Sequence, residues 1–222
     1  MKMIQTAETM MWPTLPQDLW QRRAFVAKLI PFLTWRRHGI GCLQGYIYEG
    51  ERQELRVHIW SRALMLDGIE ESGNAHNHRF ELESSVLYGS LLHTEYHLRR
   101  DDERGDHALF TFVPARQQTD ENRSEMVPLE GRYEVRKHPM IVDAGWTYLH
   151  RRGCYHSTAL NTDIAVTLVE KHEQLVNEQA RVVAPVSQAP VPAFGGGEVP
   201  SNVMESLLRG AVGLLNTKLR AT

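Results

Sequence analysis

Gly73-Asn74-Ala75-His76-Asn77-His78 is the stretch of this sequence that decides the fold. Two histidines at positions i and i+2 of an extended segment point to the same side of a strand, so both imidazoles can reach one metal ion. On a helix the same result would need i, i+4 spacing. A third imidazole from a distant strand, His156, completes a set that leaves positions on the metal open. The spacing therefore predicts a metal site built on β-strands.

The segment around this stretch is typical of strands from Gly41 to about Lys171. The predicted strands, which are rich in β-branched and aromatic residues, are Gly41–Tyr48, Glu54–Leu64, Ser85–Leu98, His107–Val113, Arg132–His138, Gly145–His150 and Ile164–Lys171. Turn signals lie between them, at Gly50-Glu51-Arg52-Gln53, Arg104-Gly105-Asp106 and Glu130-Gly131. Many short strands without intervening helices predict an all-β fold, either an antiparallel barrel or a double-sheet jelly roll.

Helices are predicted at both ends of the chain. Pro16 to about His38 has apolar residues at helical spacing, and Pro31 is expected to kink or split this helix. A second helix, capped by Ser201, carries an apolar stripe that must cover the barrel or a second subunit. The stripe consists of Val203, Leu207, Leu208, Val212, Leu215 and Leu219. The expected organisation is a helical segment at 1–40, a barrel at 41–175, a Pro/Gly linker at 176–200 and a helix at 201–222.

Composition sets limits on function. The 222 residues provide for one barrel-sized domain with helical attachments, and 42% apolar and 23% charged residues are ordinary for a globular protein. The net charge of −2 gives no reason to expect nucleic acid or an anionic membrane as a partner. Two cysteines, Cys42 and Cys154, are too few for a disulfide scaffold. No apolar leader or membrane span is evident, so a cytoplasmic protein is expected.

At this point the sequence resembles the cupin superfamily over about residues 41–171. The first cupin motif has the form G-x5-H-x-H-x3–4-E-x6-G, and a second motif carries a later histidine and often an asparagine. Here His76, His78 and Glu83 match the first motif, Gly89 comes one residue early, and Gly145, His156 and Asn161 echo the second motif with altered spacing. Neither Gly68 nor Gly73 stands at the position of the leading glycine. The resemblance implies a cupin-type double-sheet jelly-roll barrel.

The expected metal ligands are His76, His78, His156 and Glu83. Neutral imidazoles with a carboxylate suit Fe(II) above all, with Ni, Mn, Co or Zn as other possibilities. Glu83 is expected either to bind the metal or to hydrogen-bond a ligating histidine, with Glu81 as its rival. His150 is the rival of His156. The histidines expected to pack or to face solvent are His58, His93, His97, His107 and His138.

Within cupins, the sequence is similar to thiol dioxygenases such as cysteine dioxygenase, which have a three-histidine Fe(II) site. The similarity lies in Val86-Leu87-Tyr88-Gly89-Ser90-Leu91, in Thr94-Glu95-Tyr96 and in His156 with Ala165-Val166-Thr167-Leu168. The arginine by which that family binds the substrate carboxylate falls at about Tyr48 here. Its proton relay falls at Thr167, Val169 and Lys171, and its crosslinked cysteine falls at about Glu83. The resemblance therefore implies the metal site of this family but does not imply its thiol substrate.

The leading hypothesis is a non-haem Fe(II) oxygenase that acts on a small polar substrate, because open positions on one ion let dioxygen and substrate bind together. Tyr88 and Tyr148 are the candidate catalytic residues, and Tyr48, Arg62 and Tyr96 are the candidate substrate-binding residues. The candidate anion-binding arginines are Arg56, Arg62, Arg79, Arg99, Arg151 and Arg152. The alternatives are a metal-dependent lyase, isomerase or hydrolase with a tyrosine or glutamate base, and a barrel that only binds a small ligand. A homodimer that involves one of the terminal helices is also expected.

Overall fold

A computed structural model describes residues 13–38, 41–50, 53–64, 75–113, 125–174, 179–187 and 198–217. Its helices are α1 (Leu19–Leu29), the 3₁₀ turns η1 (Ile30–Phe32) and η2 (Arg62–Leu64), and α2 (Ser201–Asn216). Its strands are β1 (Trp35–His38), β2 (Cys42–Glu49), β3 (Glu54–Ser61), β4 (His76–Asn77), β5 (Phe80–Tyr88), β6 (Ser90–Arg100), β7 (His107–Val113), β8 (Glu125–Pro128), β9 (Tyr133–Asp143), β10 (Thr147–His150), β11 (Tyr155–Leu160), β12 (Ile164–Gln174) and β13 (Arg181–Pro185).

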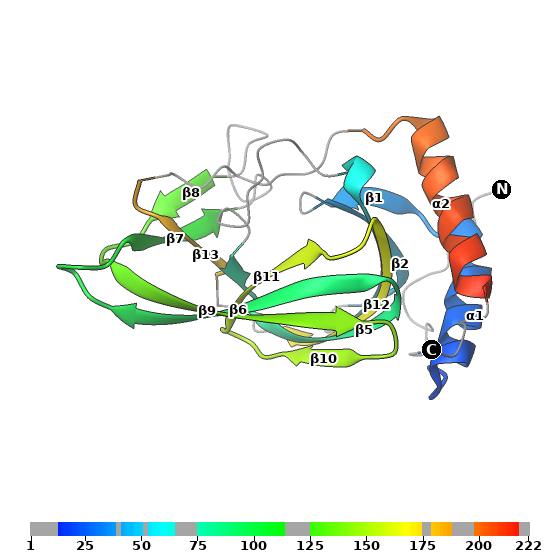
Figure 1. Cartoon of the computed structure of the whole chain (residues 1–222), viewed down its shortest axis with the longest axis horizontal. Coiled ribbons are helices and arrows are strands. Elements are labelled where there is room, and N and C mark those ends of the chain that lie inside the picture. Colours follow the sequence, from blue (N-terminus) through cyan, green and yellow to red (C-terminus); the bar gives the residue numbers. More distant parts are fainter. Residues whose placement is uncertain are drawn as a thin grey trace.

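The strands form two antiparallel sheets that face each other, with both helices at one end (Figure 1). Sheet A has the order β1-β2-β3-β12-β5-β10, and sheet B has the order β13-β4-β11-β6-β9-β7-β8. The predicted all-β double-sheet barrel with N-terminal and C-terminal helices is therefore confirmed. Neither helix in the described part of the chain is long and apolar enough to cross a bilayer.

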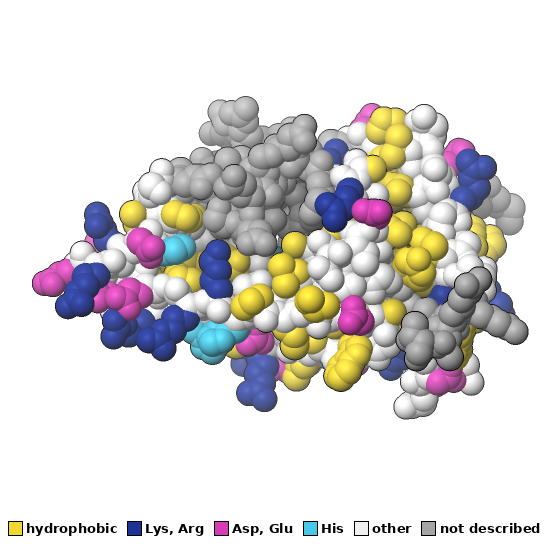
Figure 2. All heavy atoms as spheres, in the orientation of Figure 1, with side chains coloured by type: hydrophobic (Ala, Val, Ile, Leu, Met, Phe, Trp, Pro, Cys, Tyr) yellow, Lys and Arg dark blue, Asp and Glu magenta, His cyan; other side chains and the backbone are white. Residues whose placement is uncertain are grey.

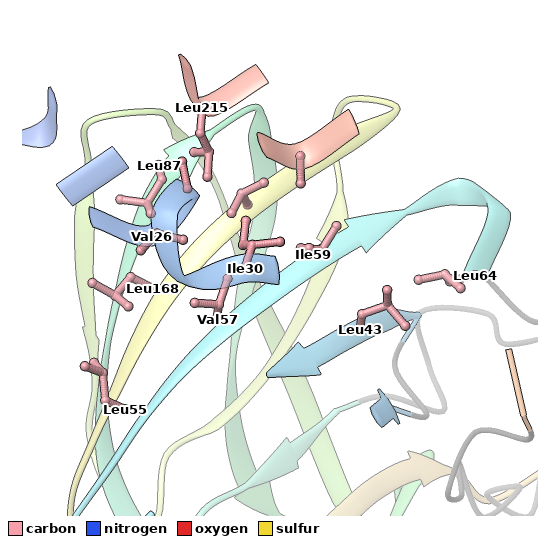
Figure 3. Packing of buried hydrophobic residues seen from close by; sticks show 13 residues of the cluster. Val26, Ile30, Leu43, Leu55, Val57, Ile59, Leu64, Leu87, Leu168 and Leu215 are labelled. Carbon is pink, nitrogen blue, oxygen red and sulfur yellow. The ribbon is translucent and has the colours of Figure 1, made fainter. Parts of the chain in front are cut away.

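Sheet A separates two environments because successive side chains of a strand point to opposite faces. Along β3, Leu55, Val57 and Ile59 are buried beneath the helices, where Figure 3 shows Val26, Ile30 and Leu215 packed against them. The alternate side chains, such as Arg56 and His58, line the space between the sheets. The same alternation in β5 and β12 divides a helix-covered core from the barrel interior.

Arg23 fixes the two helices to each other. Its side chain is buried in α1 and donates to the carbonyl oxygens of Leu214, Leu215 and Thr217 at the C-terminal end of α2, over 2.6–3.0 Å. A guanidinium at this end complements the negative pole of the helix and satisfies carbonyl groups that have no partner within α2. In the described part of the stripe, four residues pack against the core that α1 and sheet A of the same chain form, namely Leu207, Leu208, Val212 and Leu215. Leu219 lies outside the described residues, and the homodimer stays a prediction.

Several predicted boundaries were wrong. The single strand predicted at Ser85–Leu98 is a hairpin, because Gly89 turns with φ +75° and a Cβ there would lie 2.3 Å from the carbonyl oxygen of Ile164. The helix predicted up to His38 ends in the 3₁₀ turn at Pro31 and continues as β1. The predicted linker contributes β13, and Pro200 rather than Ser201 precedes the first residue of α2.

At the far end of the barrel, around the turn between β6 and β7, basic and acidic side chains are mixed (Figure 2). There Arg99 pairs with Glu134 at 2.5 Å, and Arg100 pairs with Asp102 at 3.0 Å. Within each of these exposed pairs the two opposite charges neutralise each other.

Candidate metal centre

Three histidines meet at the interior face of sheet B. His76 on β4 lies directly opposite His156 on β11, and His78 follows two residues later on the same side. The ring centroid of His76 lies 4.7 Å from that of His78 and 4.9 Å from that of His156. One ring nitrogen from each of the three lies within 4.8 Å of the other two. The structure thus brings together the three histidines that the sequence singled out.

The chemistry of this donor set fits a divalent metal. The Nε2 atoms of His78 and His156 face each other at 3.0 Å. Two nitrogens bound at right angles to one ion at about 2.1 Å are roughly 3 Å apart, so this spacing suits neighbouring ligands. Burial, together with the neighbouring imidazoles, lowers the pKa of His78 and of His156 well below the usual value. Both rings are therefore neutral at pH 7, which is the form that binds metals.

Glu83 does not join the histidines. Its neighbours on β5, Leu82 and Ser84, line the barrel interior, so alternation turns Glu83 to the helix-covered face of sheet A. There Glu83 lies opposite Glu170. The pKa of the Glu170 carboxyl is raised, first by burial and then by the charge of Glu83. Glu83, expected to bind the metal or to hydrogen-bond a ligating histidine, is thus placed away from the histidine set, and Leu82 occupies the inward position on this part of β5. Glu81, the rival, is exposed.

The three histidines open into a pocket of about 80 Å³ between the two sheets. The pocket is small beside the roughly 300–1,000 Å³ of drug-sized sites. Its lining combines polar and apolar side chains and consists of His38, Arg56, His58, Trp60, His76, His78, Phe80, Leu82, Ser84, Tyr148, His156, Thr158, Val169 and Lys171. No carboxylate side chain is among these lining residues.

Two basic side chains in one wall of the pocket form ion pairs with the same carboxylate. Lys171 on β12 donates to Glu54 at 2.6 Å, and Arg56 on β3 forms an ion pair with the same carboxylate. Arg56 also donates to Gln44, through Nη1 at 2.7 Å, when the amide oxygen of Gln44 faces it. This wall of the pocket therefore carries two basic side chains beside one carboxylate. Of the six candidate anion-binding arginines, Arg56 is the one that lines the pocket.

Tyr148, a candidate catalytic residue, reaches the pocket from β10. Burial raises the pKa of its phenol, although hydrogen bonds with Ser84 and Thr158 counteract part of this effect. The hydroxyl is therefore protonated at neutral pH, and it can donate a hydrogen bond or a proton.

The other predicted side chains lie elsewhere. Tyr88 and Tyr48 pack against the helix-covered core, and Arg62 pairs on the surface with Asp163 at 3.0 Å. Tyr96 is buried on β6, and its hydroxyl shares a hydrogen bond of 3.0 Å with Ser157. None of these four residues lines the pocket. The structure thus places the four candidate catalytic or substrate-binding residues away from this pocket, because strand position alone does not fix which core a tyrosine enters.

Sequence reasoning missed two more pocket histidines, His38 and His58. Their rings lie 6.3 Å apart, and burial lowers the pKa of His38 to about 4 and that of His58 well below its usual value. The alternation of Arg56, His58 and Trp60 within β3 was the available signal, since these three polar or aromatic side chains share one face. His38 lies on β1, within the predicted helix, and was hidden for that reason.

No known family model matches this chain, and no curated protein is similar to it in sequence. Among solved structures, the chain is similar to the DMSP lyase DddQ from Ruegeria pomeroyi, at 16% identity over 83% of this chain and 73% of that one, with a TM-score of 0.38. A structure of the DMSP lyases RdDddP and RnDddQII gives 14% identity, coverage of 74% and 69%, and a TM-score of 0.41. An RmlC-like cupin from Shewanella frigidimarina is 12% identical over 66% of this chain and 88% of that one, with a TM-score of 0.33.

The chain's own geometry carries the assignment of its fold. Two antiparallel sheets enclose a pocket, and the His-x-His pair meets a later histidine on its inner wall. The chain thus has the cupin-type barrel that its sequence predicts.

Proposed function

We propose that this chain is a metal-dependent enzyme, a non-haem Fe(II) oxygenase whose substrate is a small anion. The single observation that carries the proposal is that the three-histidine set and the cationic wall of Arg56 and Lys171 border one small pocket. His76, His78 and His156 would hold the metal through neutral ring nitrogens. Bound Fe(II) would supply the redox chemistry and the open positions that oxygen activation needs.

The residues of the chain would divide the remaining work. The wall of Arg56 and Lys171 would bind a carboxylate or a similar anion, because guanidinium and ammonium groups donate charge-assisted hydrogen bonds to anions. Tyr148 would donate a hydrogen bond to the substrate from its protonated hydroxyl. Leu82, Phe80 and Trp60 would keep water away from the reacting groups. A ligand set without a carboxylate would leave the full charge of the metal in place, as in the thiol dioxygenases that the sequence resembles.

The experiment joins metal analysis to oxygen uptake. Protein purified without chelator is analysed for metal, loaded anaerobically with Fe(II) and assayed in an oxygen electrode against carboxylates of two to six carbons, with and without thiol groups. We expect stoichiometric O2 consumption with at least one of them. His156→Ala should abolish it, whereas His138→Ala, an exposed histidine, should not. Arg56→Met should raise KM at least tenfold, while Arg62→Met, which loses only a surface ion pair, should leave KM unchanged.

A second candidate function is a metal-dependent lyase, isomerase or hydrolase. The observation in its favour is His58, a neutral imidazole in the pocket whose Nε2 has no hydrogen-bond partner in the described part of the chain. Such a nitrogen could accept a proton from the substrate. Tyr148 is protonated and Glu83 points away from the pocket, so neither is placed to act as this base. Turnover of the same substrates under strictly anaerobic conditions would favour this candidate, and binding of the anion without turnover would favour the ligand-binding alternative.

A further inference from the structure

A second group of histidines lies beside the first, and two of its three members lie outside the pocket lining. It consists of His93 on β6, His150 on β10 and His156 on β11, and one ring nitrogen of each lies within 4.8 Å of the other two. Their side chains are 2%, 1% and 5% exposed, so this group is buried more deeply than the partly exposed His76 and His78. The group and the first set share His156.

The strand register brings the three rings together from both sheets. His93 lies opposite Thr158, two residues along β11 from His156, so both histidines point into the barrel from sheet B. His150 lies opposite Leu82 in sheet A and points inward with it. The rings of His150 and His156 stack with centroids 3.7 Å apart, and His93 lies 5.2 Å from His156. The group therefore bridges the two sheets at the bottom of the pocket.

The hydrogen bonding of these rings is incomplete. Nδ1 of His156 is buried and has no hydrogen-bond partner in the described part of the chain, and the buried ring of His150 has no side-chain hydrogen-bond partner there, its polar contact being with the backbone of Cys154. Buried polar groups are normally hydrogen-bonded, and unpartnered imidazole nitrogens are the donor atoms that late first-row metals prefer. His156 faces His78 through Nε2, which leaves its Nδ1 available to a second partner. His93 is oriented by Thr158 Oγ1, 3.5 Å from its Nδ1.

We infer that His93, His150 and His156 form a second metal-binding set, which takes a late first-row ion such as Zn(II) or Co(II) and joins β10 of sheet A to β6 and β11 of sheet B. The set is closed to substrate, because His93 and His150 do not line the pocket. Its role is structural. The inference does not rest on the proposed function, since it requires neither oxygen chemistry nor the anion-binding wall.

The test removes the first set and keeps the second. His76→Ala/His78→Ala is titrated with Co(II), and bound cobalt is measured by elemental analysis and visible absorption after unbound ion has been removed. We expect about one equivalent of bound Co(II) and an unfolding temperature that rises when Co(II) is added. Adding His150→Phe, which replaces the buried ring by an apolar one, should reduce the bound Co(II) at least tenfold. The matched triple variant with His97→Phe, an exposed histidine, should retain it.

The inference is overturned if the His76→Ala/His78→Ala protein binds less than a tenth of an equivalent of Co(II), or if His150→Phe leaves its binding unchanged. Circular dichroism establishes that each variant is folded, and His76→Gln/His78→Gln replaces the alanine pair if that pair does not fold. Oxygen uptake separates the two hypotheses. If the protein consumes O2 but fails the cobalt test, only the second metal set is refuted. If it passes the cobalt test but consumes no O2 with any substrate, only the proposed function is refuted.

Discussion

Replacing Glu54 by glutamine tests the charge balance of the pocket wall. The carboxylate is 13% exposed and neutralises Lys171, which is 8% exposed, and Arg56, which is 17% exposed. Removing one partner of a buried ion pair costs about 3–5 kcal/mol, because the remaining charge is left without compensation. Arg56 retains the ring of Tyr46, 5.0 Å away, and the amide of Gln44. We therefore expect the lower end of that range, about 3 kcal/mol.

The assay is urea unfolding followed by tryptophan fluorescence and circular dichroism. Glu134→Gln is the matched control, because it removes a carboxylate whose partner Arg99 is 70% exposed, and such surface pairs contribute about 0–1 kcal/mol. Small carboxylates added to the Glu54→Gln protein should recover part of the lost stability, since an anion in the pocket can replace the missing charge. A loss below 1 kcal/mol, or one that carboxylates do not reduce, would refute the view of this wall as an anion site.

The remaining predictions concern the frame around the site. Arg23→Met should lower the free energy of unfolding by about 3 kcal/mol in a urea titration, because charged hydrogen bonds to three carbonyls are lost, whereas the exposed Arg209→Met should cost below 0.5 kcal/mol. Gly89→Ala should cost at least about 2 kcal/mol, because its Cβ meets backbone and its φ is positive. Burial lowers the pKa of His150 to about 4, while the unfolded chain titrates near 6.5, so below pH 6.5 the unfolded state binds more protons. The metal-free protein should therefore lose about 1.4 kcal/mol per pH unit from this imidazole between pH 6.5 and 4, and the slope in a pH series of urea titrations should be shallower in His150→Phe. The predicted homodimer is tested by light scattering at micromolar concentration. We expect the mass of a dimer, and the mass of a monomer would refute the prediction.

The fold could be predicted because its signal is local. Short runs of β-branched and aromatic residues separated by turn residues indicate strands, and two histidines at i and i+2 share one side of an extended chain wherever it lies. The histidine set also needed one long-range decision, between His156 and His150. The structure places His156 opposite His76 and places His150 in the second group, so both histidines enter the barrel interior.

The substrate side of the pocket could not be predicted in the same way. Arg56, Lys171 and Glu54 are brought together by the pairing of β3 with β12. Glu54 and Lys171 are separated by 117 positions in the sequence, which leaves no local signal. A shift of one residue turns a side chain to the opposite face of a strand. That sensitivity explains why Tyr88 and Glu83 were assigned to the interior. Glu83 follows the helix-covered face of β5, whereas Tyr88 lies beyond a register shift between β5 and β12 and packs against the same helix-covered core.

The inward position of Leu82 connects the metal set to the choice of substrate. With a carboxylate at this point, the metal would carry a reduced charge and an anionic substrate would be opposed by a second negative group. An apolar side chain leaves the metal set without a carboxylate and beside the basic wall of Arg56 and Lys171, so both the metal and the wall would attract an anion. Leu82→Glu should reverse this preference. We expect the variant to retain metal and to bind carboxylates at least tenfold more weakly, as measured by calorimetry, whereas unchanged carboxylate affinity would show that charge in this pocket does not select the ligand.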